Sequence, residues 1–192
     1  MNQHDHLVRV EMYKAARELL GPGSSNGYYR PAGELTVLEI SGENFRDLLP
    51  WEAYRSVSNV DVCSADDIMA KLDGHGGEFD LVVLDHVLEH VIAPARALAH
   101  IRVGLLAPRG RVFVSTPFLI RVHPAPLDLW RWTREGLGEL LEAADFNDVQ
   151  TGSWGNRAAV VANLDGWAIA GPDSDMTNDP LFPVTCWAVG TR

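Results

Sequence analysis

The sequence predicts a doubly wound α/β fold: a mostly parallel sheet with an antiparallel final strand and helices on both faces. Segments with helical periodicity alternate with short, nearly continuous apolar runs through the middle of the chain. That order is typical of parallel strands joined by helical crossovers. The last two β-rich segments, 148–153 and 183–190, are interpreted as the antiparallel end of the sheet. The length of 192 residues suits one domain.

The N-terminal half contributes the first helices and strands. Apolar residues recur near helical period as far as Leu20, and Gly21-Pro22-Gly23 ends that helix. The run from Leu35 to Ile40 is nearly all apolar, as in a strand buried on both faces, and Pro50 ends a short helix after it. We therefore expect helices over 6–20, 44–49 and 66–72, and strands over 35–40 and 54–60.

The C-terminal half continues the alternation. Four apolar residues flanked by acids, from Glu78 to Asp85, form the strongest strand pattern, and Pro94 stands near the start of an amphipathic helix. Thr133 is a candidate N-cap, with Glu135 in the first turn. We therefore expect helices over 90–106 and 133–144, and strands over 78–85, 110–115, 148–153 and 183–190.

Composition narrows the classes of partner. The chain has 16 basic and 26 acidic residues, and its formal net charge of −10 leaves no electrostatic footprint for nucleic acid or an anionic membrane. No apolar run approaches the roughly 20 residues of a membrane span, and residues 1–6 lack the apolar core of a signal peptide. We expect a cytoplasmic protein that binds a small-molecule substrate and neither nucleic acid nor membrane. Nothing in the sequence indicates a homodimer.

Acidic residues stand at the carboxyl ends of the predicted strands: Glu39, Asp61 and Asp85. Ligands of open parallel sheets bind at these strand ends. A single acid there is equally well explained by solvent exposure. Buried strands need no carboxylates for packing, however, so the set of three favours a binding site.

Residues 35–150 resemble the class I S-adenosylmethionine-dependent methyltransferases. The matching segments are V-L-E-I-S-G at 37–42, F-D-L-V-V-L-D-H-V-L-E-H-V at 79–91, L-A-P-R-G at 106–110 and T-R-E-G-L at 133–137. The second segment is the most specific, because its length and order are hard to reach by chance. The resemblance implies a Rossmann-like sheet and methyl transfer, with S-adenosylmethionine as cofactor and S-adenosylhomocysteine as product. The cofactor-binding residues expected are Glu39, Ser41, Gly42, Phe45, Asp61, Val62, Asp85, His86 and Leu88.

The chain also departs from the pattern of that family. The first loop normally carries three glycines, whereas here Ser41 precedes a single one, Gly42. The segment before the strand at 78–85 is shorter than in that family, so we expect a reshaped adenine pocket. The resemblance implies that Asp61 either holds the ribose hydroxyls or faces the adenine. These departures support an alternative, a methyltransferase-like binding or scaffold protein without activity. A nicotinamide-dependent oxidoreductase is disfavoured because no G-x-G-x-x-G motif is present.

The loop after the strand at 110–115 is the expected substrate side. His123 is predicted to be a general base, and Asp128 to orient it or the substrate; the alternative for Asp128 is a structural ion pair with Arg131. The resemblance of this loop to those of sugar-modifying methyltransferases favours O-methylation of a sugar or a secondary metabolite. The candidate substrate-binding residues are Tyr29, Arg121, Trp130, Arg131, Trp154, Asn156 and Arg157.

One domain over 1–192 is expected to hold all these parts. Its N-terminal helix and lid loop span 1–34, its cofactor-binding core 35–117, and its substrate-side loops 118–132 and 151–182. His86 and His90 are four residues apart, which on a helix places two imidazoles on one face. We expect no metal site there, because no third ligand is near in the sequence.

Overall fold

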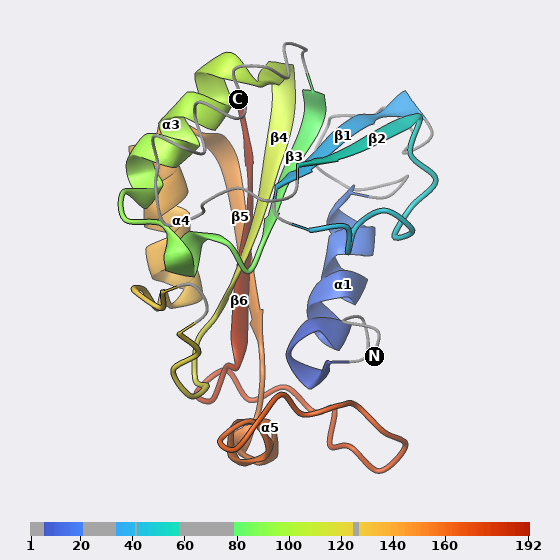
Figure 1. The fold of residues 1–192 in the computed structure, drawn as a ribbon, viewed down its shortest axis with the longest axis vertical. Coiled ribbons are helices and arrows are strands. Elements are labelled where there is room, and N and C mark those ends of the chain that lie inside the picture. The colour runs from blue at the N-terminus through green and yellow to red at the C-terminus, as the bar shows by residue number, and fades with distance from the viewer. Residues whose placement is uncertain (1–5, 21–33, 41, 58–78, 125–126) are drawn as a thin grey trace.

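The structure is a computed structural model that describes residues 6–20, 34–40, 42–57, 79–124 and 127–192. Its centre is a six-stranded sheet in the order β2-β1-β3-β4-β6-β5 (Figure 1). The first four strands of that order are parallel, and β6 runs antiparallel to both β4 and β5. The strands are β1 (Thr36–Ile40), β2 (Ala53–Val57), β3 (Phe79–Asp85), β4 (Leu106–Pro117), β5 (Asn147–Trp154) and β6 (Thr185–Thr191). The predicted fold class, including the antiparallel final strand, is confirmed.

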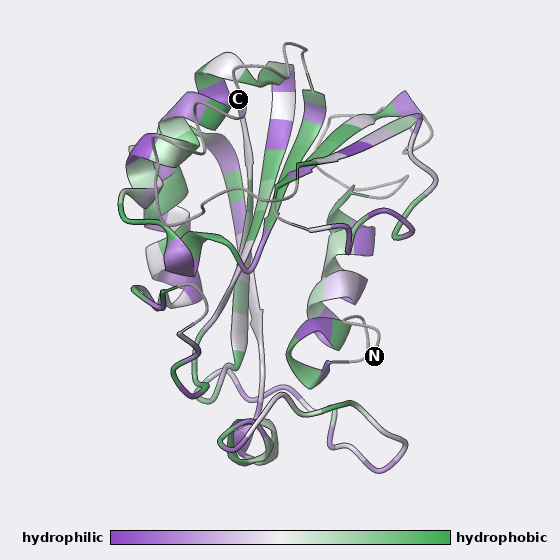
Figure 2. Ribbon diagram, in the orientation of Figure 1, coloured by the Kyte–Doolittle hydropathy of each residue, from purple (hydrophilic) through white to green (hydrophobic). Residues whose placement is uncertain are grey.

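Helices cover both faces of the sheet. Helices α3 (Pro94–Gly104) and α4 (Arg134–Ala143) lie on one face and α1 (Leu7–Leu20) lies on the other (Figure 1). Each face of the sheet has its own hydrophobic cluster. The cluster under α3 and α4 contains Leu98 and Leu141, and the cluster under α1 contains Met12. Because both faces of β3 are covered, all seven of its residues are buried. Figure 2 shows the hydrophobic residues gathered along the central strands.

Two local predictions were wrong. Residues 44–49 form turns rather than a helix, and a short helix, α5 (Arg157–Ala162), lies in the segment expected to be a loop. The turns at 44–49 are held by hydrogen bonds to Glu39, a tertiary contact that helical periodicity does not reveal. The predicted helix over 66–72 and the last residues of the strand over 54–60 lie outside the described residues. Among the described residues, no helix combines the length and the apolar character needed to cross a membrane.

The N-cap of α4 agrees with the sequence. The hydroxyl oxygen of Thr133 accepts a hydrogen bond of 3.1 Å from the amide of Gly136, as predicted for a cap. This cap fixes where the loop after β4 ends and α4 begins. The described parts of the loop before α4, residues 118–124 and 127–132, reach the turn after β3, where the Leu129 amide donates to the Glu89 backbone oxygen at 2.8 Å.

Candidate active site

Glu39 organises the loop after β1. Its carboxylate accepts hydrogen bonds from the amides of Asn44 (2.9 Å) and Phe45 (2.8 Å) and from the Tyr54 hydroxyl (2.5 Å). A Cβ on Gly42 would lie 2.6 Å from Glu39 Oε1, so a side chain there would displace the carboxylate that holds the loop. Burial raises the pKa of Glu39 to about 7. The loop is thus wrapped around one buried carboxyl group at the end of β1.

Asp85 joins four separate parts of the chain at the end of β3. One oxygen accepts from Ser115 Oγ on β4 at 2.6 Å; the other accepts from Tyr13 Oη at 2.9 Å, Asn44 Nδ2 at 3.0 Å and Arg9 Nε at 3.2 Å. Burial opposes ionisation, but the charge of Arg9 and these donors outweigh it and lower the pKa of Asp85 to about 2. The ionised Asp85 therefore anchors α1 to the strand end.

The chain turns sharply after Asp85. His86 has a φ of 54°, a left-handed conformation that is uncommon for a residue with a side chain and is frequent at functional sites. Its amide donates to the Ser115 backbone oxygen at 3.1 Å. The turn leads into a short 3-10 helix, η4 (Leu88–His90), which presents Glu89 and His90 beside the strand end. His86 and His90 therefore do not share an α-helix, and the α-helix expected from residue 90 begins instead at Pro94.

A cavity of about 240 Å³ lies at this turn, lined mainly by imidazoles. Its walls come from α1, the turn after β3, the loop after β4 and the segment before β6. The lining residues are His6, Arg9, His86, Glu89, His90, His123 and Trp167. Trp167 packs against three of the imidazoles, with centroid distances of 5.4 Å to His123, 6.0 Å to His6 and 6.5 Å to His86. The imidazole nitrogens and the Glu89 carboxyl group can therefore form hydrogen bonds to a small molecule in the cavity.

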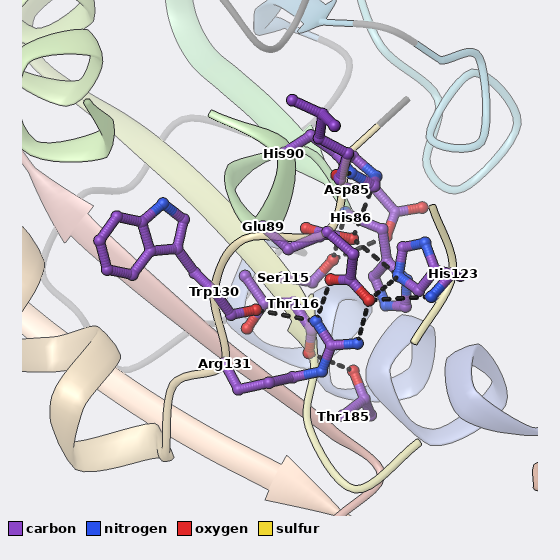
Figure 3. Close-up of polar contacts among 12 residues, drawn as sticks. Asp85, His86, Glu89, His90, Ser115, Thr116, His123, Trp130, Arg131 and Thr185 are labelled. Carbon is purple, nitrogen blue, oxygen red and sulfur yellow. Dashed lines mark hydrogen bonds and ion pairs between the residues drawn. The ribbon is translucent and has the colours of Figure 1, made fainter. Parts of the chain in front are cut away.

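His123 lies in this cavity, as the sequence reasoning required of a base. Its Nε2 is 3.9 Å from Glu89 Oε1 and 4.0 Å from Asp128 Oδ2, and its ring is 5.1 Å from that of His90 (Figure 3). Nε2 is buried and has no hydrogen-bond partner among the described residues. Burial lowers the pKa of His123, so the ring is neutral and carries a lone pair at neutral pH.

Glu89 is the feature that the sequence reasoning missed. Its side chain is 0% exposed, and neither carboxylate oxygen has a hydrogen-bond partner in the described parts of the chain. Burial raises the pKa of Glu89 to about 8. A buried carboxyl group without partners is costly, so its presence in a cavity points to function. In the sequence Glu89 follows the apolar pair Val87-Leu88 and precedes His90. We interpreted this acid only as part of the segment that resembles the methyltransferase family.

Asp128 and Arg131 form the structural pair that the sequence offered as an alternative. The guanidinium contacts both oxygens of the carboxylate, with Nη2 at 2.5 Å from Oδ2. The same Oδ2 accepts the backbone amide of His123 at 2.9 Å. Asp128 thus positions His123 through its backbone. A second cavity, of about 400 Å³, is lined by Asp128, Trp130 and Arg131 together with apolar residues of the same loop.

The remaining candidate residues lie elsewhere. Asn156 is the N-cap of α5 and donates to the backbone oxygens of Asp175 and Thr177, while Trp154 is buried beside α1. Arg157 lines a separate cavity near α5, and Arg121 donates to the Asp165 backbone oxygen at 3.2 Å. Phe45 and Leu88 are fully buried in the core. Tyr29, Ser41, Asp61 and Val62 lie outside the described residues.

Comparisons with known proteins identify the family and the fold of the chain. A family model described as a methyltransferase domain matches residues 36–151, which is more than half of the chain. No curated protein matches the sequence. The solved structures that are similar include a methyltransferase in complex with the Haloferax volcanii Trm112 methyltransferase activator (14% identity, TM-score 0.56, covering 98% of this chain and 90% of that one).

Two further structures resemble the whole chain at low identity. An S-adenosylmethionine-dependent methyltransferase from Archaeoglobus fulgidus is 12% identical, with a TM-score of 0.54 over 97% of this chain and 93% of that one. An S-adenosylmethionine-dependent methyltransferase from Mesorhizobium loti is 13% identical, with a TM-score of 0.55 over 96% of this chain and 98% of that one. The chain belongs to the methyltransferase-domain family, and it has the Rossmann-like fold of the S-adenosylmethionine-dependent enzymes.

Proposed function

We propose that this protein transfers a methyl group from S-adenosylmethionine to a small molecule bound in the imidazole-lined cavity, and that the acceptor is a hydroxyl of a sugar or secondary metabolite. The observation that carries the proposal is the position of the cavity. It opens beside the carboxyl end of β3, where His86 follows Asp85, and ligands of parallel sheets bind at such strand ends.

The loop after β1 fits the proposed cofactor. Gly42 leaves room for the Glu39 carboxylate, which shapes the loop by accepting the amides of Asn44 and Phe45. We assign to the cofactor Glu39, Ser41, Gly42, Phe45, Asp61, Val62, Asp85, His86 and Leu88. Phe45 and Leu88 act here by supporting the loop and the turn from the core, because their side chains are fully buried.

The residues of the cavity suit transfer to a hydroxyl. When bound, S-adenosylmethionine supplies a methyl group on a sulfonium. The acceptor oxygen forms the new carbon–oxygen bond as the carbon–sulfur bond breaks, and the sulfur keeps the electron pair. The hydroxyl must give up a proton, and the neutral His123 can accept it at Nε2. Asp128 holds the backbone of His123 in place, and Arg131 holds Asp128.

Methyl transfer is tested by measuring S-adenosylhomocysteine formed over a panel of hydroxyl-bearing sugars and secondary metabolites. We expect product with at least one acceptor. His123→Gln should lower kcat about 100-fold and leave the affinity for S-adenosylmethionine within about twofold. The matched control is His100→Gln, on α3 and outside the cavity. Full turnover by His123→Gln would remove its role as base. No product and no cofactor binding would favour the inactive scaffold.

A further inference from the structure

The cavity brings together three metal-ligating side chains from distant parts of the chain. Glu89 and His90 come from η4, and His123 comes from the loop after β4. One ligand atom from each lies within 4.8 Å of the other two, with Nε2 of His90 and of His123 at 3.7 Å and 3.9 Å from Glu89 Oε1. Figure 3 shows Glu89 and His123 converging there. Two ligands of a tetrahedral zinc ion, each about 2.0–2.1 Å from it, are about 3.4 Å apart. The two histidine–glutamate distances are therefore only a few tenths of an ångström longer than those in a bound shell.

The histidines are held in the form that a cation requires. His90 Nδ1 contacts the backbone oxygen of Leu127. A carbonyl oxygen only accepts hydrogen bonds, so Nδ1 carries the proton, and in the neutral imidazole Nε2 then carries a lone pair on the side of Glu89. A backbone carbonyl in this position is the usual support of a metal-bound imidazole. Nε2 of His123 is buried and has no hydrogen-bond partner among the described residues. The same is true of both carboxylate oxygens of Glu89.

The nearby cations do not neutralise Glu89. Arg9 also lines the cavity, but its guanidinium is bound to Asp85, and Arg131 is bound to Asp128. Glu89 is thus a fully buried carboxyl group without its own counter-charge. The charged form of such a group is expensive to bury unless it is paired or coordinates a metal, so a cation bound here would supply the missing counter-charge.

We propose that Glu89, His90 and His123 bind one divalent transition-metal cation. Two imidazole nitrogens and one carboxylate form the three-ligand set of open zinc and non-haem iron sites, whose remaining positions take water or substrate. Glu89, His90 and His123 all line the cavity. There the cation takes the acceptor hydroxyl and lowers the pH at which that hydroxyl loses its proton to water. In this role the cation, rather than His123, activates the acceptor oxygen. Only this role rests on the proposed function; binding itself does not. In the sequence no third ligand stands near His86 and His90, but folding brings the ring of His123 within 5.1 Å of that of His90.

Zn²⁺ binding to the chelator-treated protein, without cofactor or acceptor, tests the site by calorimetry. We expect one ion per chain, bound at least tenfold more weakly by Glu89→Gln and by His123→Gln, and with unchanged affinity by His100→Gln. Glu89 is in the core, so His123→Gln, in a loop, guards against a variant that fails to fold. Co²⁺ absorption in the visible range should likewise depend on Glu89 and His123. Equal affinity of the wild type and both variants would overturn the site, since the ion would then bind elsewhere.

The role in transfer has a separate readout. Removal of the cation should lower turnover at least tenfold and leave the affinity for S-adenosylmethionine within about twofold, and Zn²⁺ or Mn²⁺ should restore it. Full turnover by the metal-free enzyme would refute this role and leave His123 as a plain base. A protein that binds Zn²⁺ at Glu89 and His123 but transfers no methyl group would refute the proposed function and support the metal site.

Discussion

Replacing Asp85 by asparagine keeps the shape of the side chain and removes the charge that pairs with Arg9. The pKa of Asp85 is lowered from 3.8 to about 2 in the folded protein, a shift of just under two units. At about 1.36 kcal/mol per unit, the ionised group contributes about 2.5 kcal/mol to the free energy of unfolding at pH 7. The variant also leaves Arg9 buried without its partner, so we expect a loss of about 3 kcal/mol.

The pH dependence of this loss tests its cause. A carboxyl group with a lowered pKa stabilises the fold fully above its unfolded pKa near 4, and the effect disappears as the pH falls through about 2. Urea denaturation followed by circular dichroism should therefore show roughly half the charge-dependent difference at pH 3. Tyr13→Phe, which removes one hydrogen bond to the same carboxylate, should cost only about 1 kcal/mol. Equal stability of Asp85→Asn and the wild type at pH 7, or a difference that stays constant down to pH 3, would refute the reasoning.

Three further predictions concern the loops that frame the site. The pKa of Glu39 is raised from 4.5 to about 7, so the neutral form is favoured in the folded protein. The free energy of unfolding of the wild type should therefore fall by about 3 kcal/mol relative to that of Glu39→Gln as the pH rises from 4.5 through 7. Urea titrations of both proteins that show no pH-dependent difference would contradict this. Gly155→Ala should lower the free energy of unfolding by about 3 kcal/mol, because the added Cβ would lie 2.3 Å from the Phe182 backbone oxygen. Gly166→Ala, whose Cβ would have nothing within 4 Å, is the control and should be nearly neutral. Similar thermal midpoints for the two variants would contradict this. Thr133→Ala should cost about 1 kcal/mol through the lost N-cap of α4, which a urea titration can measure and an unchanged midpoint would exclude.

Much of the fold could be predicted because it depends on local patterns. Buried strands such as β3 are continuous apolar runs, and the cap of α4 is a single recognisable residue, Thr133. Residues 44–49 were predicted wrongly because their amides bond to the buried side chain of Glu39, five and six residues earlier, and these bonds override a weak helical preference. The helix α5 is only six residues long, too short for a periodic pattern.

The site could be predicted only in part, because it depends on contacts between distant segments. The sequence indicated His123 and the strand-end acids, but it contained no sign that residue 123 folds back onto residue 89. Arg9 and Trp167 come from elements far from the motifs and reach the cavity only through α1 and the segment before β6. Conversely, Asn156 and Trp154 looked unusual in sequence, yet their contacts are those of a helix cap and a core residue.

Calorimetric titration with S-adenosylmethionine and with S-adenosylhomocysteine tests the central claim most directly. We expect both compounds to saturate one site per chain at about micromolar affinity, and Asp61→Ala to weaken both at least tenfold. Asp173→Ala, an exposed acid in the loop before β6, serves as the control and should bind like the wild type. Failure of both compounds to bind the wild-type protein would contradict a working cofactor site and, with it, methyl transfer by this chain.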